Sequence, residues 1–103
     1  MLMKKVIGFD WDSGNLRKNE KKHCVTDREP EEIFFNKPII IAHDLLHSTH
    51  EKRFSALGIT SAKRLLNIVF TMRHNRIRVI SARPMSKKER IIYEKEKKKN
   101  TKF

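Results

Sequence analysis

Hydrophobic and polar positions alternate most regularly near the carboxyl end, in the segment RIRVISAR at residues 76–83. An extended chain sends successive side chains to opposite faces, so this alternation predicts a strand with one packing face and one positively charged face. The proline that follows cannot continue a central hydrogen-bonded ladder and ends the strand. The packing face would hold Ile77 and Val79, and the other face Arg76, Arg78 and Ile80, with Arg83 closing the segment.

Earlier segments have the lengths and apolar content typical of strands. Residues 6–9 predict a short opening strand, and residues 39–42 predict a strand that is buried on both faces. Residues 52–60 and 65–72 predict two further strands, with a bulge expected at Gly58. The connections at residues 61–63 and 73–75 are short, which favours antiparallel neighbours.

Capping residues and charge predict three helices. The first begins at Asp12 or Ser13 and ends near residue 23, and the second spans residues 27–36. The third follows Ser86, because Glu89 stands three residues later and completes a capping box. Its lysines continue into a basic tail at residues 98–103, which we expect to be disordered.

These elements predict one α+β domain over residues 1–97. Its antiparallel twisted sheet has four to five strands, with two helices on the amino-terminal side and one at the carboxyl end. A chain of 103 residues fits one domain with one modest core.

The charge balance narrows the classes of partner. The chain has 24 Lys plus Arg against 12 Asp plus Glu, a formal net charge of +12. A body this small and this positive attracts RNA, DNA, an anionic membrane or an acidic protein, and charge does not choose among them. No apolar run approaches the roughly 20 residues of a membrane-spanning helix. Acidic and aromatic residues follow the first lysines where a signal peptide needs an apolar core, so a cytoplasmic location is expected.

Motifs for nucleotide hydrolysis, dinucleotide binding and zinc catalysis are missing from the sequence, and we expect neither a metal nor another cofactor. Cys24 is the single cysteine, which excludes an internal disulfide, and it is expected to be a small buried residue. His43, His47 and His50 lie close together, but polar loop residues are favoured over metal ligands there. Trp11 is expected to close the end of the core and not to stack on a base.

Several motifs together carry a family resemblance. In chain order they are FDWD at 9–12, NEKKH at 19–23, FFNKPI at 34–39, EKRFSALGIT at 51–60, RLLNIVFTMR at 64–73, RIRVISAR at 76–83 and KKERIIYE at 87–94. Over roughly residues 6–96 the chain resembles the BrnT family of type II toxins. This resemblance implies a RelE-like fold and a ribonuclease that degrades RNA and halts translation and growth.

The resemblance also implies a partner. BrnT toxins are covered by a BrnA antitoxin, whose ribbon-helix-helix part binds DNA and represses the shared operon. The expected complex has two toxins and two antitoxins, and operator DNA is bound only through the antitoxin. The chain departs from the family pattern at Cys24, where glycine usually follows the lysine–histidine pair, and at Asn15, where lysine is frequent.

Matching motif positions imply the site residues. A metal-free ribonuclease needs cationic donors for the charge on the phosphorane and groups that move two protons. Arginine suits the first task because its fork binds two phosphate oxygens and keeps its charge. The resemblance implies Arg64 and Arg83 as principal phosphate stabilisers, with Arg53 and Arg78 beside them. The candidates for RNA binding or proton transfer are Lys22, His23, Arg76, Arg90 and Tyr93.

Purely structural roles remain open for these residues. The arginine strand has the pattern of a solvated edge strand that charge protects from pairing. His23 stands where an imidazolium would favourably cap a helix, and Arg90 with Tyr93 is equally typical of a solvated helix face. For the whole chain, the rival hypothesis is a basic module that binds RNA or an antitoxin and cleaves nothing.

Overall fold

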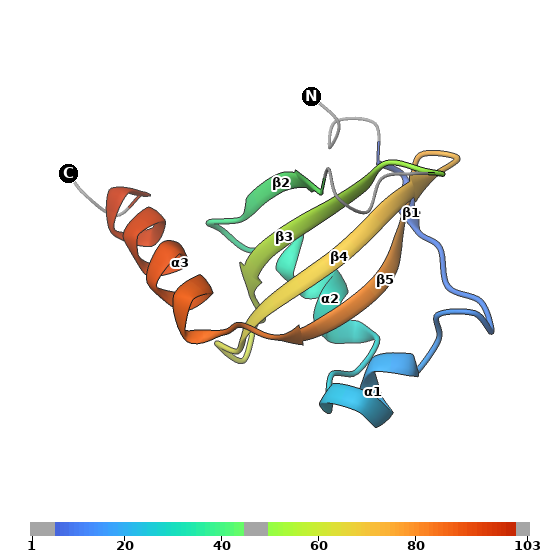
Figure 1. Cartoon of the computed structure of the whole chain (residues 1–103), viewed down its shortest axis with the longest axis horizontal. Coiled ribbons are helices and arrows are strands. Elements are labelled where there is room, and N and C mark those ends of the chain that lie inside the picture. Colours follow the sequence, from blue (N-terminus) through green and yellow to red (C-terminus); the bar gives the residue numbers. More distant parts are fainter. Residues whose placement is uncertain (1–5, 45–49, 101–103) are drawn as a thin grey trace.

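A computed structural model describes residues 6–44 and 50–100 of the chain (Figure 1). Five strands form one sheet in the order β1-β5-β4-β3-β2. All neighbours are antiparallel except β1, which runs parallel to β5. The predicted α+β class and strand number are confirmed, and the parallel pair makes the sheet mixed. The strands are β1 (Gly8–Phe9), β2 (Ile40–Asp44), β3 (Arg53–Ile59), β4 (Leu65–Arg73) and β5 (Arg76–Pro84).

Two short helices precede the main strands and one longer helix follows them, as predicted. They are α1 (Lys18–His23), α2 (Arg28–Ile33) and α3 (Lys87–Asn100). α1 begins later than expected because the chain first makes a turn, in which the N–H groups of Asn15 and Leu16 donate to the carbonyl of Asp12. α3 continues through residues 98–100, which the sequence assigned to a tail, while residues 101–103 lie outside the described residues.

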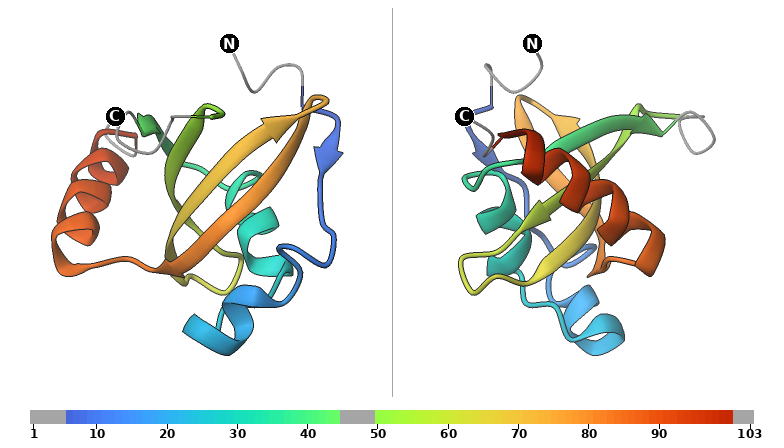
Figure 2. Two further views of the ribbon diagram at one scale, coloured as in Figure 1. Left: turned by 45° about the vertical axis from the view of Figure 1, so that its right-hand side comes forward. Right: turned by 90° about the vertical axis from the view of Figure 1, so that its left-hand side faces the viewer.

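The main core lies between α2 and one face of the sheet (Figure 2). Ile33 of α2 sits against Gly58 so closely that a Cβ on this glycine would stand 2.8 Å from the Ile33 Cβ. The absence of a side chain at Gly58 therefore lets α2 approach the sheet closely, and Gly58 pairs regularly with Leu66. The bulge expected at Gly58 is wrong. The buried residues of this core are Val25, Ile33, Ala56, Leu66, Ile68, Phe70, Ile77, Val79 and Ala82.

α3 packs through a smaller apolar cluster at one end of the sheet (Figures 1 and 2). Tyr93 is fully buried there against Leu57 and Ile59, which alternation places on the face opposite the main core. The Tyr93 hydroxyl donates to the carbonyl of Pro38 at 2.7 Å, and burial raises its pKa. α3 thereby covers one end of this sheet face. The other end, toward Arg53, carries no helix within the described residues and is the open face of the sheet (Figures 1 and 2).

Two buried asparagine side chains hydrogen-bond the outer edge of β5 where the two-residue strand β1 no longer covers it. The Asn15 side-chain amide donates to the carbonyls of Val79 and Asp10, and Asn19 accepts from the N–H of Ala82. Both are 3% exposed. Buried backbone groups need such partners, so these amides replace a strand where the chain has already turned away. Asn15 thus has a structural role in the interior of the protein.

Trp11 closes the end of the main core, as predicted, and its indole N–H donates to Glu31 at 2.7 Å.

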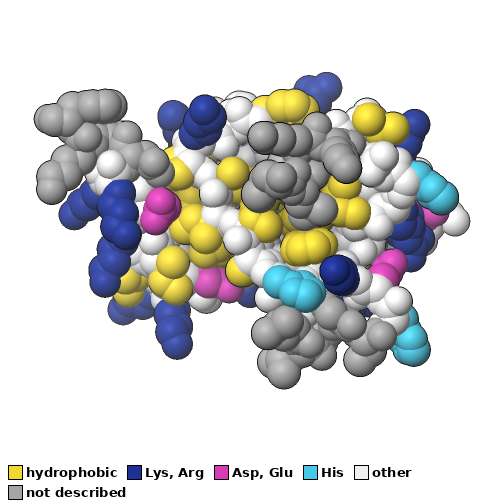
Figure 3. Space-filling model, turned by 90° about the horizontal axis from the view of Figure 1, so that it is seen from above, with side chains coloured by type: hydrophobic (Ala, Val, Ile, Leu, Met, Phe, Trp, Pro, Cys, Tyr) yellow, Lys and Arg dark blue, Asp and Glu magenta, His cyan; other side chains and the backbone are white. Residues whose placement is uncertain are grey.

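No helix in the described part of the chain is both long enough and apolar enough to cross a membrane. Lysine and arginine side chains gather along α3, at the left of Figure 3.

Candidate functional site

A register shift in β5 decides which arginines share a face. Pairing with β4 runs regularly from Arg76 to Val79 and resumes at Ser81, so Ile80 is the extra residue of a bulge. Strict alternation would send Arg83 to the face opposite Arg78. Because of the bulge, Arg78 and Arg83 both stand on the open face, opposite Thr71 and Asn67 of β4.

A polar hollow of about 180 Å³ lies on this open face. Its floor comes from β3, β4 and β5, and its wall comes from the turn before α1. Four cations and one carboxylate line it, and this excess of positive groups suits an anion. The charged residues are Lys18, Arg53, Arg73, Arg78 and Glu51, and the others are Gly14, Asn15, Val79 and Ile80.

Arg78 is the best-anchored cation of the hollow. Its guanidinium donates two parallel hydrogen bonds to Asp12, at 2.9 and 3.0 Å, and lies 3.4 Å from Asp10. The hydrogen bond to Asp12 raises the pKa of Arg78, and the same bond lowers the pKa of Asp12. Only 12% of the Arg78 side chain is exposed. This bidentate pair fixes the direction of the guanidinium, which lines the hollow.

Gly14 leaves room for this arrangement. Its N–H donates to the Asp12 carboxylate at 2.8 Å. A Cβ at this position would stand 2.9 Å from Arg78 Nη2 and 3.1 Å from Asp12 Oδ1. Any side chain here would push the guanidinium out of position.

The other charged groups of the hollow are less constrained. Arg73 contacts Glu51 at 3.4 Å, and both side chains are partly exposed. Lys18, the first residue of α1, is exposed and has no hydrogen-bond or ion-pair partner within residues 6–44 and 50–100. An ammonium group with no competing carboxylate can bind an incoming phosphate without first breaking a contact.

Arg83 lies on the same face but is held at the start of α3. It makes a bidentate pair with Glu89 at 2.8 and 2.9 Å. Glu89 also accepts from the Asn67 amide at 2.6 Å and from the N–H of Ser86, as the predicted capping box requires. The Arg83 hydrogen bond is the main reason that the pKa of Glu89 falls to about 2.

Arg64 occupies a different place, just before β4 and next to both short helices. It donates to the carbonyl of Cys24 at 2.7 Å, to the carbonyl of His23 and to both carboxylate oxygens of Glu29 at 3.1 Å. These bonds tie the end of α1 to α2. Arg64 does not line the hollow that contains Arg53 and Arg78.

The second group of candidates is dispersed. Lys22 and His23 are on α1 near Arg64, and Arg76 is exposed beside β1. Arg90 is exposed on the outer side of α3, whereas Tyr93 on the same helix is in the core. Tyr93 therefore positions α3 and is not accessible to RNA. Of the nine predicted residues, Arg53 and Arg78 are the two that line the polar hollow, whereas Arg64 and His23 contact each other elsewhere.

Cys24 is exposed, so its predicted burial is wrong. It ends α1 with φ 55° and ψ 37°, a left-handed conformation that favours glycine. A glycine would adopt this conformation without the cost that a Cβ brings. Of the three clustered histidines, His43 lies with its ring 5.3 Å from that of Phe54, and His47 lies outside the described residues.

A match to a protein-family model identifies the family of this chain. The ribonuclease toxin BrnT of type II toxin–antitoxin systems matches residues 11–89. The chain belongs to the BrnT family. No curated protein matches it. Every residue that lines the polar hollow lies within the matched range. As a type II toxin, this BrnT protein acts opposite a cognate antitoxin.

Sequence reasoning missed several residues of the hollow. Lys18 is on α1, Glu51 lies just before β3, and Arg73 is in β4. The register between β3 and β4 brings Glu51 beside Arg73, and the packing of α1 against β5 adds Lys18. Asp12 was predicted only as a possible helix cap, and Gly14 was not predicted to have a role. The FDWD motif carried a usable signal, because two carboxylates beside a predicted arginine strand suggest a clamp for one of its guanidinium groups.

Proposed function

We propose that this BrnT protein is a metal-independent endoribonuclease whose phosphate site is the polar hollow on the open sheet face. The observation that carries the proposal is the clustering of Lys18, Arg53, Arg73 and Arg78 around one small space. Preorganised cations supply the charge stabilisation that a metal ion supplies in other nucleases. Cleavage of cellular RNA then inhibits translation and growth.

The chemistry is attack of a ribose 2′-oxygen on the adjacent phosphorus. Glu51 is the one carboxylate among the described residues of the hollow, and it accepts the 2′-hydroxyl proton. Arg78 and Arg53 bind the non-bridging oxygens as charge builds on them. Lys18 donates a proton to the leaving 5′-oxygen. The products are a 2′,3′-cyclic phosphate and a free 5′-hydroxyl.

Arg83 and Arg64 take supporting roles in this proposal. Arg83 shares the open face with Arg78, and its outward N–H groups bind a phosphate next to the reacting one. Arg64 acts through the fold, because its bonds to the end of α1 hold the helix that carries Lys18. Lys22, His23 and Arg90 add electrostatic attraction for RNA at longer range.

The partner of the proposal is a BrnA-type antitoxin with a ribbon-helix-helix part that binds operator DNA. The net charge of +12 favours an acidic protein as the neutralising partner. Two toxins and two antitoxins form the complex, since ribbon-helix-helix parts dimerise when they bind DNA. The toxin acts in the cytoplasm, where its RNA is.

The test is incubation of the purified, antitoxin-free chain with total RNA in EDTA. We expect cleavage that resists the chelator and falls about 100- to 1,000-fold in Arg78→Ala, the usual effect of removing a preorganised donor. Arg28→Ala is the matched control, because Arg28 is an exposed arginine outside the hollow. Detection of 2′,3′-cyclic phosphate ends checks the reaction class.

Two other results would contradict the proposal. Cleavage that stops in EDTA and returns with Mg²⁺ would mean that a metal supplies the charge. RNA that is bound with equal affinity by wild type and Arg78→Ala, and is cleaved by neither, would support the binding module instead. Glu51→Gln refines the assignment, because it should reduce cleavage while RNA affinity stays within about threefold.

A further inference from the structure

An apolar groove of about 410 Å³ lies between β1 and the end of α2, away from the polar hollow. Two of its residues are unusually open to solvent, since Phe35 is 79% exposed and Ile7 is 66% exposed. Exposed large apolar side chains that gather around a groove mark a protein-binding surface. The apolar residues that line it are Val6, Ile7, Phe9, Phe34, Phe35 and Ile77.

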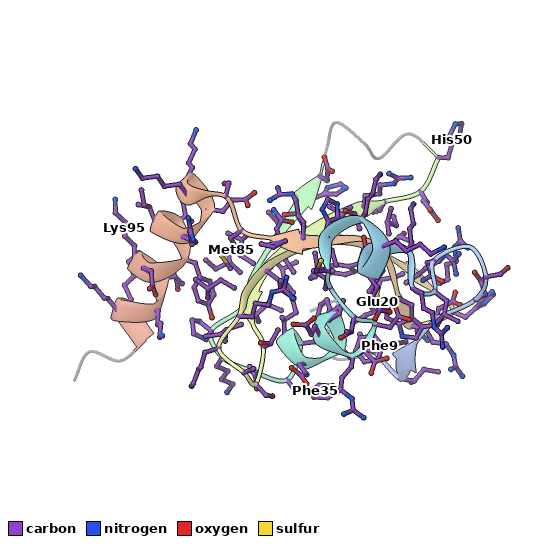
Figure 4. All side chains as sticks on the ribbon, turned by 90° about the horizontal axis from the view of Figure 1, so that it is seen from below. Phe9, Glu20, Phe35, His50, Met85 and Lys95 are labelled. Carbon is purple, nitrogen blue, oxygen red and sulfur yellow. The ribbon has the colours of Figure 1, made fainter. Side chains whose placement is uncertain are left out.

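The groove is built on the aromatic part of the core. Phe35 packs edge-on against Phe9, with ring centroids 6.3 Å apart (Figure 4). Phe9 also packs against Phe34, with ring centroids 5.9 Å apart. Phe34 in turn contacts the fully buried Phe70 at 5.1 Å. The wall of the groove is therefore held in place before any partner arrives, and a rigid aromatic residue loses little entropy on binding.

A positive charge stands at the rim. Arg76 is paired in register with Gly8, and its Nη1 lies 3.8 Å from the point where a Gly8 Cβ would be. Within the described ranges, 6–44 and 50–100, the Arg76 side chain has no hydrogen-bond or ion-pair partner. An unpaired guanidinium beside an apolar groove fits a peptide that offers a large apolar side chain next to a carboxylate.

We propose that this groove, with Arg76 at its rim, is a docking site for the cognate antitoxin. An acidic antitoxin segment places a large apolar side chain between Phe35 and Ile7 and a carboxylate on Arg76. The inference rests on the proposed function, because it takes the partner to be an acidic antitoxin. The groove and the polar hollow share no lining residue, so docking and RNA cleavage are separable by mutation.

The test compares full-length variants for affinity toward the purified antitoxin from the adjacent reading frame, and for cleavage of total RNA. We expect Phe35→Ser to weaken antitoxin binding about 10- to 100-fold, as loss of an aromatic anchor does, with cleavage within about twofold of wild type. Arg76→Glu should weaken antitoxin binding similarly. Ile91→Ser is the matched control, because Ile91 is 53% exposed on α3 and lies outside the groove.

Each alternative has its own result. Antitoxin affinity within twofold of wild type in both Phe35→Ser and Arg76→Glu would overturn the docking site. Reduced RNA cleavage with unchanged antitoxin affinity in Phe35→Ser would identify the groove as a base-binding platform. A wild-type dimer that Phe35→Ser converts to a monomer, with unchanged antitoxin affinity, would identify a self-association surface. A wild type that cleaves no RNA, yet loses its antitoxin in Phe35→Ser, would refute the nuclease and keep the docking site.

Discussion

At the residue scale, one arginine side chain is held in a fixed orientation by two other residues. Arg78 is clamped by Asp12, and the Asp12 carboxylate is in turn held by the N–H of Gly14. The entropy of ordering a long side chain is thus paid during folding and not during RNA binding. A clamp of this kind is needed where the direction of a guanidinium fork matters.

Gly14→Ala tests the geometry of the clamp. The new methyl group would meet Arg78 Nη2 at 2.9 Å, and the end of a flexible side chain yields before the backbone does. We expect the free energy of unfolding to change by less than about 1 kcal/mol, while RNA cleavage falls about 10- to 100-fold because the donor is displaced. The measurements are urea denaturation and single-turnover cleavage. Ser13→Ala, in the same exposed turn, should change neither quantity.

Cys24→Gly tests the strain at the end of α1. A residue with a Cβ is destabilised by roughly 1–2 kcal/mol in the left-handed conformation. Glycine avoids this cost, but its unfolded chain has more conformational entropy, which offsets part of the gain. We expect a net gain of about 0.5–1 kcal/mol in the free energy of unfolding. Cys24→Ala keeps the Cβ and removes the thiol, so it should bring no such gain. Equal stabilisation by both variants would mean that the thiol, and not the backbone, was unfavourable.

At the element scale, β5 combines two roles that regular alternation cannot combine. Its first half places Ile77 and Val79 in the core, and the bulge at Ile80 then lets Ala82 return to the core while Arg83 joins Arg78 outside. The sequence predicted the strand from its local pattern, but ended it at Arg83, whereas β5 includes Pro84, which pairs with Leu66. The bulge was missed because it depends on the pairing with β4, which no short segment of sequence encodes.

The start of α3 is tied to the sheet by Glu89, and Glu89→Gln tests this tie. Its pKa falls from 4.5 to about 2 in the folded protein, mainly because of Arg83. A carboxylate whose pKa is lower in the folded protein stabilises the fold at pH values above its unfolded pKa of about 4.5. This stabilisation is lost as the pH falls toward 2. Since Arg83 is partly exposed, we expect Glu89→Gln to cost about 1–2 kcal/mol at pH 7.

The pH profile distinguishes this cause from simple loss of a helix cap. The difference in free energy of unfolding between wild type and Glu89→Gln should be constant above about pH 5 and shrink as the pH falls toward 2. Urea denaturation at a series of pH values measures it. Glu94→Gln, an exposed change on the same helix, should leave stability unchanged. A difference that stays constant down to pH 2 would rule out the ionised pair as the source.

At the scale of the whole molecule, the net charge of +12 supplies attraction and the hollow supplies geometry. Neutralising phosphates releases counterions, so the affinity for single-stranded RNA should fall with salt with a slope of about −0.7 per contacted phosphate. We expect Arg78→Ala to make this slope shallower by about 0.7 in a log–log plot. Fluorescence anisotropy with a labelled RNA measures it. An unchanged slope in Arg78→Ala, or an equal change in Arg28→Ala, would remove Arg78 from the phosphate contacts.

The sequence by itself determined the class of the fold, the number of strands, the three helices and the family. These follow from local alternation, capping residues and motifs that lie within short stretches of chain. Only the tertiary structure decided which cations meet. Lys18, Glu51 and Arg73 reach the hollow, Arg64 turns to the helix ends, and Tyr93 goes into the core. The physical reason is that register, bulges and burial arise from pairing between distant segments, and each of them sets where a side chain points.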